Sequence, residues 1–314
     1  IHCKNHHTKW TKTRGKNFGI MKRLSILIIV SACILPMAYS QNFLGFNTDI
    51  GLAWQYDNLA ITHSKAGVDF SIGGTYQLQK NMFLLHTGIG ISPRWTRQLL
   101  DNETIKVNML DTEEIPFTYI GYIEDRTDKL ASLDLSIPLM MGVKYKKFYT
   151  LLGAKLYIPL VCNTHQTASL TTIGDYGDRY YDVLKDMPEH GFFTDKIVNS
   201  SGKLALQPDL RICIELGWNS RIPTYSLRPN APCVQIGAFL EYGILNTLTA
   251  SSFGQSTQVD CTHFMNIEMQ HIYSTKERSD AFVKNMRIGL RAAVLFPTSK
   301  NKGTRCKICR YNFE

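Results

Sequence analysis

Past residue 40 the sequence lacks any run of 18 apolar residues, so no segment there is able to cross a membrane as a single helix. It also lacks the Gly-rich phosphate loop, the nucleophile elbow and the paired-histidine helix motif. Charged residues make up 19% of the chain, which is below the usual quarter for soluble domains. These absences argue against a helical membrane protein and against the common enzyme classes.

Residues 41–314 also lack the excess of basic residues that nucleic-acid binding needs. The net charge is +9, with 35 basic and 26 acidic residues. Seven of the basic residues lie in residues 1–40, which hold no acid, so the remainder is nearly neutral at about +2. A nucleic-acid role requires the basic footprint on the folded domain, and we predict none here.

Residues 21–40 have the features of a secretion signal. Lys22 and Arg23 form its positive start, residues 24–35 are apolar, and a small-x-small motif ends at Ser40. We therefore predict cleavage between Ser40 and Gln41.

Two other readings of the N-terminal region stay open. We interpret residues 1–20 as translated upstream sequence, although they could be a cytoplasmic basic tail ahead of an uncleaved anchor. Cys33, which follows Val-Ser-Ala, is the alternative acceptor of a lipoprotein signal.

The dominant signal after the leader is alternation of apolar and polar residues with period two, which predicts β-strands. Eight segments show it: residues 46–56, 67–79, 83–95, 132–145, 148–160, 203–219, 233–245 and 285–297. Strands of 11–17 residues are longer than the usual five or six and long enough to cross a bilayer.

The connections between these segments alternate in length. One set consists of residues 80–82, 146–147 and 220–232, and the other set, which is longer on the whole, consists of residues 57–66, 96–131, 161–202 and 246–284. Short turns on one side and long loops on the other are typical of outer-membrane barrels. The sequence predicts an all-β fold, an eight-stranded antiparallel up-and-down transmembrane β-barrel over residues 41–297, followed by a short periplasmic tail at 298–314.

A soluble barrel would also alternate, so the composition of the two faces has to decide. No Asp, Glu, Lys or Arg lies on the apolar face of any of the eight segments. The polar face is rich in Gly, Ser, Ala and Thr, which fit the narrow interior of an eight-stranded barrel. The large apolar residues are therefore predicted to face lipid.

Aromatic residues gather near the ends of the predicted strands, where interfacial girdles lie in membrane barrels. An ordinary preference of aromatics for strands is the alternative explanation. The predicted girdle residues are Trp54, Tyr56, Trp95 and Tyr242 towards the long loops, and Tyr145, Phe148, Trp218 and Phe296 towards the short turns.

The polar face carries nearly equal numbers of acids and bases, which must pair if they are buried. We predict that they form a charge network that plugs the lumen, with a proton or ion path as the alternative. The network residues are Asp49, Asp69, Asp134, Lys144, Lys155, Asp209, Arg211, Glu215, Glu241, Arg287 and Arg291.

Chemistry outside the lumen has little support. His165, His190 and His271 fall in predicted loops with no common spacing, so no catalytic residue, metal or cofactor is predicted. Cys162 and Cys261 fall in different outer loops and could form a disulfide there, a pairing that the sequence leaves open.

Two segments carry a family resemblance. Residues 133–160 read LDLSIPLMMGVKYKKFYTLLGAKLYIPL, and the last strand ends in MRIGLRAAVLFP. The first is a strand with an Ile-Pro-Leu step, a tight basic hairpin and a returning strand that bears glycine. This pattern resembles the PorT-like outer-membrane β-barrel families of Bacteroidota. The resemblance implies an outer-membrane barrel, and it transfers no catalytic residue because these families share architecture more than activity.

The sequence thus predicts a non-enzymatic outer-membrane protein with a plugged lumen and long outer loops for binding, adhesion or envelope maintenance. The alternatives are a narrow porin-like channel or transporter, and an accessory subunit of an outer-membrane secretion system. The expected partners are outer-membrane lipids, the barrel-assembly machinery during insertion, and an extracellular ligand or an envelope protein.

Overall fold

The computed structural model describes residues 41–111, 113–177, 183–221, 231–248, 259–260, 268–269, 271–274 and 281–298. The predicted signal peptide, the segment before it, nearly all of the predicted tail and Cys261 lie outside these residues. Within the described part of the chain, no helix is long and apolar enough to cross a membrane.

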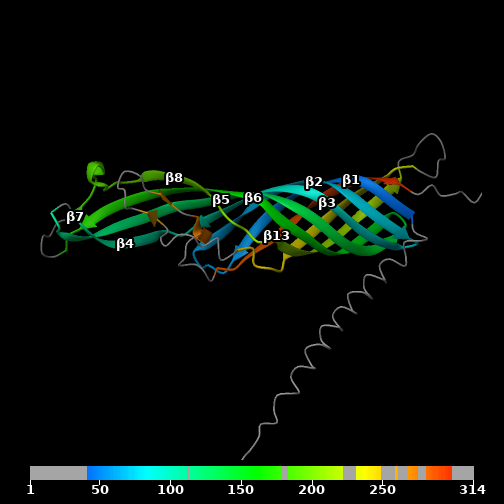
Figure 1. The fold of residues 1–314 in the computed structure, drawn as a ribbon, viewed down its shortest axis with the longest axis horizontal. Coiled ribbons are helices and arrows are strands. Elements are labelled where there is room, and N and C mark those ends of the chain that lie inside the picture. The colour runs from blue at the N-terminus through cyan, green and yellow to red at the C-terminus, as the bar shows by residue number, and fades with distance from the viewer. Residues whose placement is uncertain are drawn as a thin grey trace, which may run out of the picture.

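Eight strands close into a hydrogen-bonded ring (Figure 1). Around the ring, antiparallel neighbours follow the order β5-β3-β2-β1-β13-β10-β9-β6, and pairing of β6 with β5 closes it. The ring strands are β1 (Gln41–Asp57), β2 (Thr62–Lys80), β3 (Phe83–Leu100), β5 (Pro116–Tyr145), β6 (Phe148–Asp175), β9 (Asp209–Arg221), β10 (Cys233–Gly243) and β13 (Val283–Pro297). The predicted eight-stranded antiparallel barrel is therefore confirmed.

The two ends of the barrel differ. At one end, residues 81–82 join β2 to β3 and residues 146–147 join β5 to β6. The start of β1 and the end of β13 lie at this same end, where Phe43 faces Pro297 across the ladder. We call it the turn end, and we call the opposite end the mouth.

Beyond the mouth the wall continues as a separate feature, which we call the projecting sheet (Figure 1). It consists of residues 116–127 of β5 and 167–175 of β6, with three added strands along their edges: β4 (Glu103–Leu110) beside β5, and β7 (Val183–Leu184) and β8 (Lys196–Lys203) beside β6. The shorter elements are η2 (Pro188–His190), β11 (Val259–Asp260), β12 (Glu268–Met269) and η4 (Ile272–Ser274).

The projecting sheet corrects two predicted loops. Residues 96–131 and 161–202 were expected to be loops, yet β5 and β6 run through them as strands of 30 and 28 residues. Residues 163–167 are polar on both faces, so period two does not show in their hydropathy, although Thr and His there pair in register with β5 and β8. These parts of β5 and β6 form strands because they pair with neighbouring strands and because Thr, Tyr and Ile, which are frequent among them, prefer the extended conformation.

Two further boundaries were wrong. The connection between β1 and β2 is only residues 58–61 instead of residues 57–66, because β2 begins at Thr62. The predicted strand 203–219 begins at Asp209, because Pro208 has no N–H to donate to a ladder and residue 203 ends β8.

Irregularities in the ladder keep the polar residues facing inward. Pairing of β5 with β6 shifts between Leu133 and Asp134. Tyr157 before this shift and Cys162 after it are both buried, although their numbers differ in parity. The shift lets the long strand β6 bury one face along its whole length.

Candidate functional site

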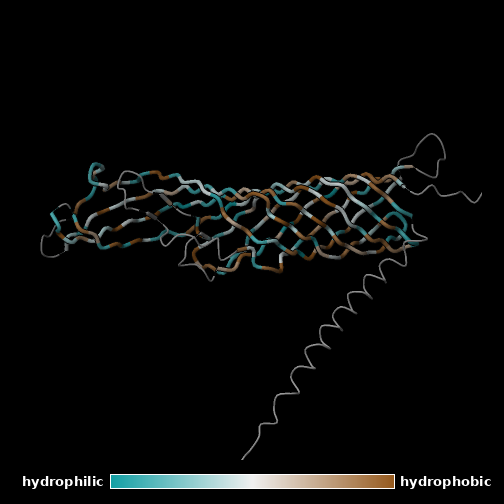
Figure 2. The backbone as a smooth tube through the Cα atoms, viewed as in Figure 1, coloured by the Kyte–Doolittle hydropathy of each residue, from teal (hydrophilic) through white to brown (hydrophobic). Residues whose placement is uncertain are grey.

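The outer surface of the ring carries large apolar side chains on all eight strands, and Figure 2 shows hydrophobic and hydrophilic residues alternating along them. Phe46 on β1 is 71% exposed and Leu139 on β5 is 62% exposed. The other strands contribute Ile72, Ile89, Leu152, Leu216, Ile236 and Leu290 to the same surface.

Such a band is unfavourable in water and favourable in hydrocarbon. The closed ring also satisfies the backbone N–H and C=O groups of its strands, as a membrane interior requires. The barrel therefore spans a membrane, and an antiparallel barrel with these dimensions and short turns at one end is an outer-membrane structure.

The predicted girdle residues all lie on this outer surface. Tyr145, Phe148 and Trp218 face one another in turn across β5, β6 and β9 at the turn end. Phe296 lies at the same end opposite Leu44. The residues nearer the mouth are Trp54, Tyr56, Trp95 and Tyr242, of which Trp54 is half-buried and the others are exposed. That they mark the two interfaces of the bilayer remains a prediction.

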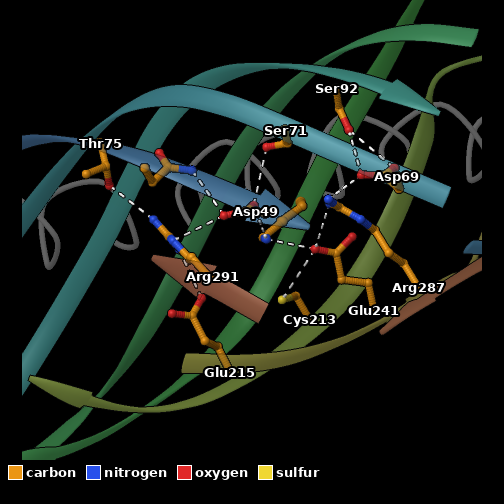
Figure 3. A network of polar contacts seen from close by, with 12 residues as sticks. Asp49, Asp69, Ser71, Thr75, Ser92, Cys213, Glu215, Glu241, Arg287 and Arg291 are labelled. Carbon is orange, nitrogen blue, oxygen red and sulfur yellow. Dashed lines mark hydrogen bonds and ion pairs between the residues drawn. The ribbon is translucent and has the colours of Figure 1, made fainter. Parts of the chain in front are cut away.

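The interior of the barrel is charged around two acidic centres (Figure 3). The first centre is Glu241, which is fully buried. Its carboxylate lies 2.7 Å from Nζ of Lys155 and accepts a hydrogen bond of 2.8 Å from the hydroxyl of Tyr157. Guanidinium nitrogens of Arg211 and Arg287 lie 3.7 and 3.6 Å from the same carboxylate. Three bases thus share one acid.

The second centre joins Asp49 and Glu215 through Arg291. Nη1 of Arg291 lies 2.9 Å from Glu215, and its Nε lies 3.7 Å from Asp49. The hydroxyl of Tyr149 donates to Glu215 over 2.7 Å. Because Nζ of Lys155 is also 4.0 Å from Asp49, one lysine connects the two centres.

Most of the remaining predicted network residues form pairs near these centres. Arg287 contacts Asp69, which also accepts a hydrogen bond from Ser92. Nε of Arg211 lies 2.6 Å from Asp209.

Sequence reasoning missed the interior base Arg94. Its Nη2 lies 3.3 Å from Asp134, and its Nε donates to Ser132. The signal was available, because Arg94 has the same parity in β3 as the inward-facing Ser92. Lys144, which was also predicted to belong to the network, lies half-buried beside the turn end, opposite Tyr149, and its part in the network stays a prediction.

Apolar clusters lie on both sides of the charged region. Towards the turn end, Leu84, Met140, Leu151 and Phe239 pack together in the interior. Towards the mouth, another cluster includes Leu100, Leu130 and Ile272. The two cavities found beside the charged residues measure about 20 and 10 Å³, room for about one water molecule each.

The mouth cluster is held by a short lid, residues 271–273. The backbone N–H of Ile272 donates to Asp128 over 2.9 Å, and the hydroxyl of Tyr273 bonds to Asp57. Nδ1 of His271 accepts a hydrogen bond of 3.3 Å from the backbone N–H of Tyr273, so this nitrogen carries no proton and the imidazole is neutral. Arg126 pairs with Asp128 at 3.0 Å and fixes the carboxylate that the lid uses.

Other candidate chemistry is sparse. Cys162 lies on the interior face of β6 instead of in an outer loop, and neither it nor buried Cys213 and Cys233 forms a disulfide. The described residues hold no group of three or more His, Cys, Asp or Glu side chains placed to bind a metal ion.

No family model matches the chain, and no curated protein does. The PorT-like resemblance therefore stays a prediction. Among solved structures, the chain is similar to Ail, the attachment invasion locus protein of Yersinia pestis, in a complex with the heparin analogue sucrose octasulfate and without it. The sequence identity is 10% to the complex and 12% to the structure without the analogue, and the TM-scores are 0.25 and 0.26. Each match covers 81% of this chain and 99% of the Ail chain.

Neisserial surface protein A is a third similar structure, with 10% identity, a TM-score of 0.24, and coverage of 80% of this chain and 96% of that one. Similarity this distant says nothing of function, which has to be argued from the residues themselves.

The first prediction concerns Glu241. The variant Glu241→Gln removes the carboxylate that three buried bases share, and it should lower the free energy of unfolding by about 3–5 kcal/mol. Urea unfolding in lipid vesicles, followed by tryptophan fluorescence, measures this. Glu124→Gln removes an exposed carboxylate from β5 and should change stability by less than about 0.5 kcal/mol. Equal stability of the two variants would show that the interior charges are not a coupled network.

The second prediction concerns pH at the lid. Burial lowers the pKa of His271 below its ordinary value, nearby Arg126 lowers it further, and Asp128 opposes both. An opened lid therefore binds a proton more readily than a closed one, so the lid is fully stable above about pH 6.5 and loses stability as the pH falls below that value.

Hydrogen exchange measures this effect. The amides of Ile272 and Tyr273, corrected for intrinsic rates, should exchange faster at pH 5.5 than at pH 7.5. His271→Asn keeps an acceptor near the position of Nδ1 and should remove the pH dependence. If that variant keeps the same pH dependence as the parent, another group controls the lid.

Proposed function

We propose that this chain is a non-conducting, non-enzymatic outer-membrane barrel that holds the projecting sheet outside the cell as a binding surface. The observation that carries the proposal is the continuation of β5 and β6 from the barrel wall into that sheet. Outer-membrane barrels place their short turns in the periplasm. The mouth and the projecting sheet then lie on the extracellular side.

The projecting sheet has the dimensions and rigidity of a binding element. At about 3.3 Å per residue, the 116–127 part of β5 is roughly 40 Å long. Its inner face is covered, because the carbonyl of Gly191 accepts hydrogen bonds from the hydroxyls of Tyr119 and Thr172. Phe192 and Phe193 pack on that face. A sheet braced in this way offers a fixed surface, which suits recognition better than a flexible loop.

Two parts of the sheet remain open to a ligand. The outer face is largely polar: it carries exposed or half-buried Thr118, Thr167, Thr171 and Asn199, with the exposed side chains of Tyr122 and Ile197 among them. The edge strand β4 pairs only with β5 among the described residues, so its other edge has backbone groups available for an added strand. A protein or glycan on another cell or in the envelope is the class of ligand that such a surface suits.

The third prediction tests the binding role by trimming the sheet. Leu99 lies opposite Thr127, and Thr167 lies opposite Asn199, so an Asn-Gly turn can close each pair after removal of residues 100–126 and 168–198. The trimmed chain should still fold as a barrel, shown by different gel mobility of unboiled and boiled samples. Its binding to cell surfaces and glycan arrays should be lost, and binding equal to that of the full chain would contradict the proposal.

The fourth prediction separates this role from the channel alternative. The interior is filled by the paired charges and by apolar clusters on both sides, so the intact protein should give no single-channel steps in planar bilayers. A double variant, Arg287→Ala with Glu241→Ala, removes an acid and a base that lie 3.6 Å apart in the interior and serves as the positive comparison. Steps from the unaltered protein would favour the narrow channel over a plugged barrel.

A further inference from the structure

A row of basic residues crosses five neighbouring strands on the outer surface, near the mouth. Lys65 on β2 lies opposite Arg97 on β3, Arg97 opposite Lys129 on β5, and Lys129 opposite His165 on β6. Lys203 on β8 lies one step nearer the turn end, beside His165. All five side chains are exposed. We call these five residues the cation row.

The cation row has no acid in the adjacent parts of the ladder. The next outward-facing row towards the tip consists of His63, Leu99, Thr127, Thr167 and Asn199. The next towards the turn end consists of Val68, Trp95, Ala131 and Asn163, and Asn163 lies opposite Lys203. Among the ion pairs of the described residues, none involves Lys65, Arg97, Lys129 or Lys203. Like charges directly opposite one another destabilise a sheet, so the row suits an anion that lies across it.

Most of the cation row borders a groove of about 750 Å³. Arg97, Lys129, His165 and Lys203 line it, together with the exposed side chain of Trp95. This volume lies within the usual range for small-molecule sites. The groove therefore combines four basic side chains with an apolar floor.

The height of the groove indicates what occupies it. Trp95 and Val68, which are 51% and 50% exposed, lie directly on the turn-end side of the row, and the lipid-facing Ile91 and Leu135 follow. Because Trp95 belongs to the predicted girdle near the mouth, the cation row is expected at the level of the lipid headgroups in the outer leaflet. An amphiphile at this position places its acyl chains on the apolar strands and its anionic head on the row.

The row is also confined to one side of the barrel, unlike a girdle of interfacial lysines. On the opposite side of the barrel, the basic residue near the mouth that the structure describes on the outer surface is Lys284. Its ammonium group lies over the rings of Tyr242 and Phe282. The cation row lies on one side of the barrel, the neighbouring rows carry no acid, and a groove borders it. We infer that Arg97, Lys129, His165 and Lys203 form a binding site for the phosphate groups of a phosphorylated outer-leaflet glycolipid.

This inference is independent of the proposed binding role of the projecting sheet. The trimmed chain described above keeps Lys65, Arg97, Lys129, His165 and Lys203, so it should still bind the lipid after losing its binding to surfaces. A trimmed chain that still binds cell surfaces counts against the role of the projecting sheet. Failure of the full chain to bind the lipid counts against the cation row.

The test uses the full chain in detergent micelles that contain bisphosphorylated lipid A or the same lipid after removal of both phosphates, with bound lipid counted by native mass spectrometry. The parent should retain the phosphorylated lipid and bind the dephosphorylated one at least tenfold more weakly. The double variant Arg97→Gln with Lys129→Gln should bind the phosphorylated lipid at least tenfold more weakly than the parent. Added salt should weaken the binding of the parent.

The matched control removes two charges elsewhere. Lys80→Gln with Lys106→Gln alters two exposed lysines, at the turn end and on β4, and should bind the phosphorylated lipid as the parent does. Different mobility of unboiled and boiled samples establishes that both double variants fold. Equal binding by the parent and the Arg97, Lys129 variant would overturn the site. Displacement of the lipid by inorganic phosphate or by heparin at equal concentration would overturn the lipid as its occupant.

Discussion

Closure of the ring is the constraint on which the rest of the structure depends. The ladder between β1 and β13 runs without interruption from Phe43 opposite Pro297 to Asp57 opposite Val283. In hydrocarbon an open edge would leave backbone groups without partners, at several kcal/mol for each. Once the ring is closed, each residue of its membrane-spanning strands faces either lipid or a lumen just wide enough for side chains, and the alternation of the sequence assigns it to one of them.

The narrow lumen explains why its charges are arranged as they are. Each interior charge has to find a partner among the few residues at its own height, and Lys155 serves both Glu241 and Asp49. Apolar clusters towards the turn end and the mouth separate these ion pairs from solvent. Removing water raises the cost of an unpaired charge, so it makes the pairing stricter.

How far the sequence predicts this molecule depends on whether period two is visible in hydropathy. The lipid-facing parts of the strands show it clearly, because large apolar residues must alternate with small or polar ones there. Residues 163–167 are polar on both faces, so their strand was missed until their pairing partners were known. Arg94 could have been placed inside from its parity alone, whereas the contact of Asp128 with Ile272 joins residues 144 positions apart and leaves no local signal.

The continuity of β5 and β6 has a mechanical consequence. The hydrogen bonds between them lie perpendicular to the strands. A pull on the tip of the projecting sheet, directed along the strands, therefore shears many ladder bonds at once instead of peeling them one by one. The barrel wall takes up that force through the same two strands, which run on without a break, although their pairing shifts register between Glu124 and Thr127. An attached partner that drags on the cell would thus load the fold in the direction in which its ladder resists most.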